Sequence, residues 1–258
     1  MAINFKQVED IRLLKSPLSD VICQVKFPPI LSINNDSPIE YQNSVRSRFP
    51  LYEQGQAINF IIPSSGNADI SLPEPPVKMH TFRSIDKKSF ITLSSDSFAY
   101  STSLYKHWNE FLKDFAIVDE ATQKVYQPSI VTRLGLRFIN RFTLDNTKSR
   151  SLDELYSLFK KELTCILKVD AWSRPIDLFS QLSLTDNDNT KLVIRFGTGK
   201  DNGVDLFILD IDCFDEDKQI LPSDIFSKME TYHEKIYQAF RWCVLKESLK
   251  RFEPVQTG

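Results

Sequence analysis

Glycine and histidine are scarce in this 258-residue sequence, and their scarcity argues against several kinds of site. The chain has only 7 Gly and 3 His, and neither GxGxxG nor GxxxxGK[ST] occurs in it. Those glycine patterns let a backbone wrap around phosphate groups, so a dinucleotide-binding fold and a P-loop both lack their basic parts. The histidines, His80, His107 and His233, are far apart and favour neither a zinc site nor a nucleophile–base pair. We therefore expect no cofactor.

Cysteine pairs and long apolar segments are missing as well. The four cysteines, Cys23, Cys165, Cys213 and Cys243, form no CxxC pair and are expected to be thiols of a reducing compartment. The first ten residues carry no apolar stretch of the kind found in a signal peptide. No apolar run reaches the roughly 20 residues that span a bilayer. These absences predict a cytoplasmic protein without a membrane partner.

Acidic and basic residues nearly cancel, which gives the chain a formal net charge of −2 at pH 7. Proteins that coat nucleic acid through general electrostatics carry an excess of basic residues. Any nucleic-acid binding by this chain therefore requires a local patch of positive charge.

Such a patch is predicted in segment 131–142, whose sequence is VTRLGLRFINRF. Polar and apolar residues alternate there, which is typical of a strand with one buried face. One face carries Arg133, Arg137 and Arg141, with Gly135 between the first two. The opposite face is apolar and consists of Leu134, Leu136, Phe138 and Phe142. The arginine face is our candidate anion-binding site, because guanidinium groups bind carboxylates and phosphates through paired hydrogen bonds.

Two acidic residues, Asp210 and Asp212, leave a second interpretation of the arginine face open. They share one face of a later predicted strand, and opposite charges on neighbouring strands pair across a sheet. If the two strands are neighbours, the arginines belong to an internal salt-bridge network instead of a ligand site. The same two carboxylates also suit Mg²⁺, although the spacing singles out no third ligand.

The order of the predicted elements is similar in the two halves of the chain. In the first half, strands are predicted at 20–27, 57–62, 78–85, 89–95 and 98–102, with helices at 37–49 and from 103 onwards, and an exposed loop at 64–76. In the second half, strands are predicted at 131–142, 176–185, 191–198 and 204–214, with helices at 151–166 and 223–251.

These elements predict an α+β fold in which a curved antiparallel sheet packs against helices, of the TATA-binding-protein-like or helix-grip type. The halves 1–128 and 129–258 are interpreted as two β-α-β-α pseudo-repeats that form one continuous domain. A single irregular α+β domain is the alternative.

Five segments together carry a resemblance to a known family. They are Pro17–Val21, Tyr105–Phe111, Arg133–Arg141, Leu209–Asp212 and Tyr232–Phe240. With them the chain resembles a sporadically distributed, functionally uncharacterised bacterial family of about this length, in which Tyr is common where Phe138 stands. The resemblance implies no catalytic residues, because none is established for that family. Its patchy distribution is similar to that of genes in mobile elements, toxin–antitoxin cassettes and anti-phage loci.

The missing catalytic motifs and the arginine face favour a non-catalytic binding protein, a partner or sensor subunit of a bacterial anti-phage defence or toxin–antitoxin cassette. It would bind an acidic protein or a phosphate-bearing ligand through Arg133, Gly135, Arg137 and Arg141. Two alternatives stay open: a nucleotide- or nucleic-acid-binding protein, and a metal-dependent phosphoryl-transfer enzyme using Asp210 and Asp212. Enzymatic activity is therefore undecided, with the balance against it. A protein partner is expected, and self-association is left open.

Overall fold

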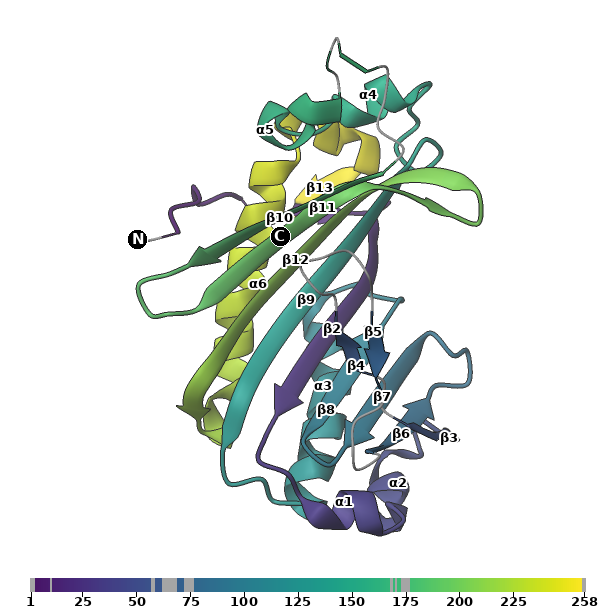
Figure 1. Ribbon diagram of the computed structural model, residues 1–258, viewed down its shortest axis with the longest axis vertical. Coiled ribbons are helices and arrows are strands. Elements are labelled where there is room, and N and C mark those ends of the chain that lie inside the picture. Colours follow the sequence, from purple (N-terminus) through teal and green to yellow (C-terminus); the bar gives the residue numbers. More distant parts are fainter. Residues whose placement is uncertain are drawn as a thin grey trace. The chain divides into compact units, whose positions relative to one another are not determined.

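The computed structural model describes residues 3–9, 11–56, 59–61, 69–71, 77–167, 169, 171–172 and 177–256. Within these residues the chain has the predicted α+β architecture, an antiparallel sheet with helices packed against it (Figure 1). The strands of the large sheet are β2 (Leu18–Lys26), β3 (Leu51–Gln56), β6 (Lys78–Arg83), β7 (Ser89–Ser94), β8 (Ser97–Thr102), β9 (Val131–Thr143), β10 (Leu178–Thr185), β11 (Lys191–Asp201) and β12 (Val204–Ile220). Their hydrogen-bonded order is β10-β11-β12-β9-β2-β8-β7-β6-β3.

Two short strand pairs lie outside this order: β1 (Ile11–Leu13) with β13 (Pro254–Gln256), and β4 (Asn59–Ile61) with β5 (Asp69–Ser71). The α-helices are α1 (Leu31–Asn35), α2 (Ile39–Val45), α3 (Trp108–Val125), α4 (Leu152–Tyr156), α5 (Lys161–Thr164) and α6 (Ile225–Cys243). The 3₁₀ segments are η1 (Cys165–Leu167), η2 (Pro222–Asp224) and η3 (Lys246–Phe252). No helix in the described part of the chain is both long enough and apolar enough to cross a membrane.

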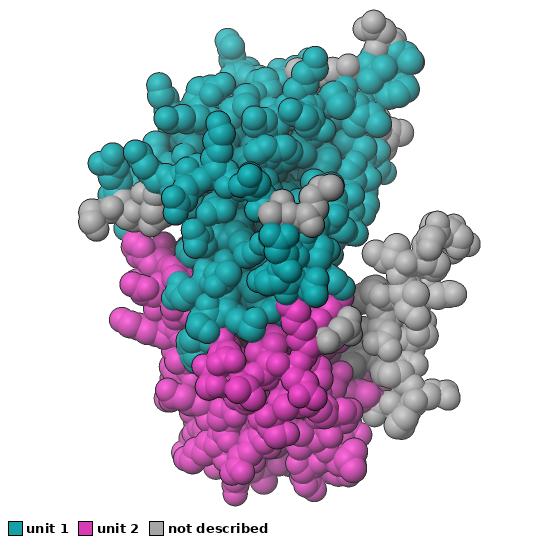
Figure 2. Space-filling model, turned by 90° about the vertical axis from the view of Figure 1, so that its left-hand side faces the viewer, with its two compact units in different colours: residues 1–21, 135–215, 226–258 teal, residues 22–134, 216–225 magenta. Residues whose placement is uncertain are grey.

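The chain divides into two compact units, each assembled from separate stretches of sequence (Figure 2). Unit 1 comprises residues 1–21, 135–215 and 226–258, and unit 2 comprises residues 22–134 and 216–225. Strands β2, β9 and β12 each contribute residues to both units. The units describe contacts and not ancestry, so the pseudo-repeats at 1–128 and 129–258 remain a prediction.

In unit 1, β11 and β12 form a long antiparallel hairpin with a tight turn. At its tip, Asn202 and Gly203 have φ angles of 50° and 82°. Positive φ at both central residues is the geometry of the type I′ turn, which an Asn-Gly pair favours. The turn fixes the register of the whole hairpin, so that Arg195 lies opposite Asp210.

Helix α6 covers the apolar face of these strands (Figure 1). The apolar stripe predicted for this segment is buried: Ile225, Met229, Tyr232, Ile236 and Phe240 lie on α6, and Val244 directly follows the helix. The helix ends at Cys243 and not at the predicted Arg251. Lys160 N donates to Cys243 O and Leu245 N donates to Leu158 O, both at 2.9 Å. These bonds pair residues 158–160 with residues 243–245 and keep both segments extended. The α-helix therefore stops, and the charged segment that follows forms η3.

The pairing of residues 158–160 with residues 243–245 also shortens the helix predicted at 151–166. Its start is confirmed, because the Ser151 hydroxyl accepts a hydrogen bond from Glu154 N at 3.2 Å, as a capping residue does. The helix α4 nevertheless ends at Tyr156, and Phe159 forms a β-bridge with Val244. A long-range pairing therefore interrupts a segment that has helical periodicity.

The core of unit 2 is aromatic. Phe98 and Tyr100 of β8 pack against Phe115 and Phe111 of α3, with ring centroids 6.0 and 5.1 Å apart. Both pairs are tilted, which is the arrangement that ring quadrupoles prefer to a face-to-face stack. These contacts fix α3 against the sheet of unit 2.

Helix α3 begins at Trp108, five residues later than the sequence predicts. Ser103 N donates to Lys88 O at 2.9 Å, and Leu104 N donates to the Thr102 hydroxyl at 3.1 Å. These bonds keep the chain extended beyond β8, so a helical turn cannot start there.

Other parts of unit 2 also differ from the prediction. Helix α1 and strand β3 were not predicted, and α2 has Pro38 at its N-cap where the sequence predicts Ser37. The strand predicted at 57–62 is found at 59–61, and β5 lies inside the loop predicted at 64–76. The remaining positions of that strand and loop lie outside the described residues.

Candidate binding surfaces

Strand β9 has the two different faces that its sequence predicts. The buried face consists of Leu134, Leu136, Phe138 and Phe142. On the other face, Arg133 and Arg137 are half-buried and Arg141 is exposed, while Gly135 is buried within the strand. Arg133 belongs to unit 2, where its Nη1 donates to Gln24 Oε1 at 2.9 Å. Gly135, Arg137 and Arg141 belong to unit 1, so the four predicted site residues are divided between the two units.

Arg137 is held by Asp210 through a two-pronged ion pair. Its Nε donates to Oδ1 at 2.8 Å and its Nη2 donates to Oδ2 at 2.7 Å. Asp210 is almost fully buried, whereas the Arg137 side chain is 41% exposed. These hydrogen bonds raise the pKa of Arg137 above its ordinary value. Strands β9 and β12 are therefore neighbours, which is the condition that the salt-bridge interpretation requires.

A second arginine, which sequence reasoning missed, also binds Asp210. Arg195 of β11 donates from Nη1 to Asp210 Oδ2 at 3.3 Å and lies 4.0 Å from Asp212 Oδ2. Its Nε donates to Gln181 Oε1 of β10 at 3.0 Å. The signal was present in the sequence, because a two-residue Asn-Gly turn fixes which residue of β11 lies opposite Asp210.

Arg141 has weaker and more exposed partners. Its Nη1 donates to Asp201 Oδ2 at 3.1 Å, and its Nη2 lies 3.7 Å from Asp20 Oδ2. All three side chains are between 35% and 50% exposed. Exposed pairs of this kind contribute only about 0–1 kcal/mol, since water and salt screen them. Arg141 can therefore exchange its partners for an external anion at little cost.

Arg137, Arg141 and Arg195, here called the arginine cluster, carry no excess of positive charge. In the described part of unit 1, the carboxylates within ion-pair distance of them are Asp20, Asp201, Asp210 and Asp212. An external anion would have to compete with these carboxylates for the guanidinium groups. The geometry of the cluster therefore favours the internal network that the sequence left open beside the ligand site.

The acidic pair on β12 is used by the same network. Both oxygens of Asp210 accept hydrogen bonds from arginine, and Asp212 lies beside Arg195. Among the described residues, no three His, Cys, Asp or Glu side chains are grouped as a metal site would require. Asp210 and Asp212 are thus placed to hold arginines, and a metal would have to displace those cations.

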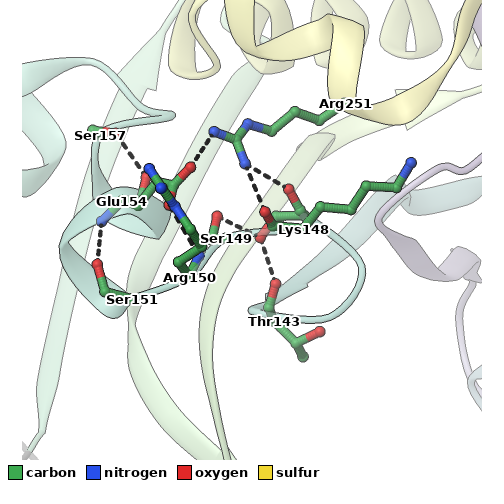
Figure 3. A network of polar contacts seen from close by, with 9 residues as sticks. Thr143, Lys148, Ser149, Arg150, Ser151, Glu154, Ser157 and Arg251 are labelled. Carbon is green, nitrogen blue, oxygen red and sulfur yellow. Dashed lines mark hydrogen bonds and ion pairs between the residues drawn. The ribbon is translucent and has the colours of Figure 1, made fainter.

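A second ionic network joins distant parts of unit 1 and has a structural role (Figure 3). Arg251 of η3 donates to Glu154 Oε1 at 2.7 Å and to the backbone oxygens of Thr147 and Lys148 at 2.9 and 3.1 Å. Hydrogen bonds from Arg251 and Arg150 lower the pKa of Glu154 to about 2. The network holds the loop before α4 against η3.

Unit 1 also contains an open groove of about 890 Å³. Its walls are the N-terminal arm (residues 3–9), the end of β10 and the last turns of α6, and Figure 1 shows the arm beside α6. The apolar side chains that line it are Ile3, Phe5, Val8, Leu182, Leu184 and Trp242. A volume of this size is in the range of pockets that bind small molecules.

The arm is attached to the helix by specific contacts. Tyr237 and Arg241 of α6 each donate a hydrogen bond to the backbone oxygen of Glu9 at 2.9 Å. The Phe5 and Trp242 rings pack with centroids 6.0 Å apart. One wall of the groove is therefore held in place by both polar and aromatic contacts.

Three cations surround the groove, and none of the described residues that line it is acidic. They are Lys6 on the arm, Lys160 before α5 and Arg241 on α6. Lys160 Nζ lies 6.0 Å above the Trp242 ring, and Arg241 is bound to neutral oxygens. Within the described residues, none of the three has a carboxylate partner at ion-pair distance. The groove thus has the uncompensated positive charge that the arginine cluster lacks.

Sequence reasoning missed this groove because its residues are far apart along the chain. Lys6, Lys160 and Arg241 belong to three segments that are far apart in the sequence, so no sequence motif contains them together. Only the tertiary packing of the arm, β10 and α6 brings them together. The comparisons with known proteins supply no further guide, since neither a protein-family model nor a curated protein matches this chain.

Proposed function

We propose that this protein is a non-catalytic binding protein whose partner is an acidic protein segment, and that the groove of unit 1 receives this segment. The observation that carries the proposal is the charge around the groove. Lys6, Lys160 and Arg241 lie around an apolar surface without a carboxylate partner among the described residues. Such a surface attracts carboxylates at its rim and apolar side chains at its centre.

The arginine cluster is the second candidate surface for the same partner. Arg141 supports it, because its exposed ion pairs with Asp20 and Asp201 can be exchanged for carboxylates of a partner. The four carboxylates around the cluster weigh against it, since they already compensate the guanidinium groups. The two surfaces can be told apart by mutation, because no residue is shared between them.

The test uses a fluorescein-labelled peptide of about ten residues in which Val and Glu alternate, with a Val–Lys peptide of the same length as the probe control. We expect the Val–Glu peptide alone to bind in a fluorescence-anisotropy titration. The double substitution Lys6→Glu and Lys160→Glu should weaken its binding at least about tenfold, which corresponds to about 1.4 kcal/mol. Neither lysine has a carboxylate partner among the described residues, so the folded protein should tolerate both changes.

The matched control is the double substitution Lys113→Glu and Lys250→Glu, which changes the net charge equally at exposed residues that do not line the groove. This control should bind the peptide as the unchanged protein does. Arg141→Gln tests the arginine cluster. If this variant loses more peptide affinity than the groove variant does, the arginine cluster and not the groove is the binding site. Absence of peptide binding, or equal loss in the groove and control variants, would overturn the proposal.

A nucleotide or nucleic acid is the alternative ligand, and the same protein can be titrated with ATP and a labelled single-stranded oligonucleotide. Binding of these probes without peptide binding, with an affinity that falls steeply as salt rises, would favour the alternative over the acidic segment.

The biological setting is proposed on the family resemblance alone. We place the protein as a partner or sensor subunit of a bacterial anti-phage defence or toxin–antitoxin cassette. Native mass spectrometry of the protein purified from its host tests this setting. A stable complex with a protein encoded by a neighbouring gene is expected, and a protein found only on its own would contradict it.

A further inference from the structure

Strand β10, which forms one side of the groove, is an edge strand. It pairs with β11 along all eight of its residues, from Leu178 opposite Thr198 to Thr185 opposite Lys191. On its other side no strand among the described residues continues the sheet. In an antiparallel ladder, alternate residues direct their N–H and C=O groups to each neighbouring strand. Half of the main-chain groups of β10 therefore point away from β11, towards a neighbour that the described chain does not supply.

The sequence of β10 does not protect this edge. The strand reads LFSQLSLT and contains neither a charged residue nor a proline. Phe179 is 73% exposed and Leu182 is 39% exposed. Natural edge strands are commonly protected by lysine, proline or a bulge, because an open edge pairs readily with another chain. An edge without these features is suited to pairing with a strand from a partner.

The other edge of the sheet order shows the usual protection. Strand β3 reads LYEQGQ, and its Glu53 forms an ion pair with Arg83 of β6 at 3.2 Å. The outer surface of β3 thus carries a charge, whereas β10 carries none.

The groove lies beside the second half of β10. Four consecutive residues, Leu182 to Thr185, line it. Since neighbouring residues of a strand point to opposite faces, four in a row place the groove at the strand edge and not on one face alone. A segment lying in the groove is therefore beside the unpaired main-chain groups.

We infer that the acidic segment binds in extended conformation and adds a strand to the outer edge of β10. This inference rests on the proposed function and specifies how the same site holds its partner. The segment has apolar side chains at alternate positions, which enter the groove beside Leu182, Leu184 and Trp242. Its carboxylates lie near Lys6, Lys160 and Arg241. Main-chain hydrogen bonds supply affinity and the alternate side chains supply selectivity, as in other cases of strand addition.

Charge decides against a second copy of this chain as the occupant. If β10 paired with β10 of another molecule, the strand would bring no carboxylate to the groove, because it contains no acidic residue. Asp177 and Asp186 flank the strand, but Asp186 is already paired with Lys235, so the groove cations would outnumber the carboxylates that such pairing brings.

A fatty-acid-like carboxylate would satisfy the apolar surface and one cation. It has no alternating N–H and C=O groups and leaves the edge of β10 unpaired. A polypeptide therefore fits both observations, the open edge and the basic groove.

The test measures amide hydrogen exchange of residues 178–185 by NMR, with and without the Val–Glu peptide. We expect alternate amides of β10, those on its outer edge, to exchange at least about tenfold more slowly in the complex, because each forms a new hydrogen bond. Amides of β3, the other edge strand, should be unchanged. Dodecanoate, which can occupy an apolar groove without offering main-chain groups, should leave the β10 amides unprotected.

Two results would overturn this inference. If the peptide binds and the Lys6→Glu and Lys160→Glu variant abolishes binding, yet no β10 amide is protected, the segment is held by side chains alone and only the proposed function stands. If the β10 amides of the free protein become protected as its concentration rises, and the protein elutes as a dimer, a second copy occupies the edge. Failure of the peptide to bind at all contradicts the proposed function itself.

Discussion

Two buried carboxylates, Asp215 in unit 1 and Asp119 in unit 2, have opposite surroundings. Asp215 is fully buried and accepts hydrogen bonds from Lys228 Nζ at 2.6 Å and from the Thr190 hydroxyl at 2.7 Å. Asp119 is 7% exposed, and its Oδ1 has no hydrogen-bond partner among the described residues. Both carboxylates have lost most of their water, but among the described residues only Asp215 has a cation within hydrogen-bond distance.

The two pKa values move in opposite directions as a result. Burial by itself would raise the pKa of Asp215, but the hydrogen bonds from Lys228 and Thr190 outweigh it and lower the pKa below its ordinary value. Burial raises the pKa of Asp119 from 3.8 to about 6. For these two carboxylates the partner, and not the depth of burial, therefore decides whether the charged form stabilises the fold.

The largest change in the free energy of unfolding is expected when Asp215, like Asp119, is left buried without a cation. The substitution Lys228→Met removes the cation and leaves Asp215 buried with neutral partners. Leaving a buried charge unpaired typically costs about 3–5 kcal/mol, and we expect about 3 kcal/mol because the Lys228 side chain is 32% exposed. Urea unfolding followed by circular dichroism at pH 7.5 measures this loss.

Adding Asp215→Asn to Lys228→Met provides the control. The neutral amide should recover part of the lost stability, since no unpaired charge remains buried. Lys250→Met, at an exposed position, should change the free energy of unfolding by less than about 0.5 kcal/mol. A loss below about 1 kcal/mol in Lys228→Met would show that Lys228 does not determine the state of Asp215.

The opposite change removes the unpaired charge from unit 2. Asp119→Asn should stabilise the protein at pH 7.5 by about 1–3 kcal/mol, because a rise of one pKa unit is equivalent to about 1.4 kcal/mol of opposition to the charged form. The folded pKa of about 6 lies above the ordinary 3.8, so protonated Asp119 favours folding at low pH. That contribution is lost as the pH rises from about 4 through about 6.

The pH dependence distinguishes this cause from a simple packing change. The gain from Asp119→Asn should be present at pH 7.5 and largely absent at pH 4.5 in parallel urea titrations. Equal gains at both pH values would indicate that the charge of Asp119 is not responsible.

The smallest effect concerns Glu154, whose partners lie near the surface. The Arg251 and Arg150 hydrogen bonds lower its pKa to about 2, so the stabilisation they give is present above the ordinary 4.5 and is lost as the pH falls through about 2. Arg251→Gln removes the first of these partners. We expect the pKa of Glu154, measured from its carboxyl carbon by NMR, to rise towards 4.5, with a small fall in Tm at pH 7. An unchanged pKa would assign the shift to Arg150 alone.

Local patterns in the sequence predicted much of the sheet. The alternation in 131–142 predicted β9 and its two faces, and the strands β6, β7, β10 and β11 were located within a few residues. Strand β12 begins where predicted but continues to Ile220, well beyond the predicted end at 214. The errors occur where distant segments act on local preference. The pairing of Phe159 with Val244 ends α6 and α4 early, although both sequences continue a helical pattern. Such a contact cannot be recognised from either segment alone.

The binding surfaces were predictable to a smaller extent. The pairing of arginines on β9 with Asp210 was one of two interpretations, and choosing between them required knowing that β9 and β12 are neighbours. Arg195 could have been found from the Asn202-Gly203 turn. The basic groove was beyond the reach of sequence patterns, because it depends on where the N-terminal arm packs.

The pairing of β1 with β13 has a consequence for synthesis on the ribosome. Ile11 lies opposite Gln256, so this ladder joins two segments that are far apart in the sequence. Unit 1 cannot be completed until residues 254–256 have left the exit tunnel, so β1 must wait for β13 while all the residues between them are synthesised. Residues 22–134 supply most of unit 2 much earlier, so nascent chains should acquire protease resistance there first.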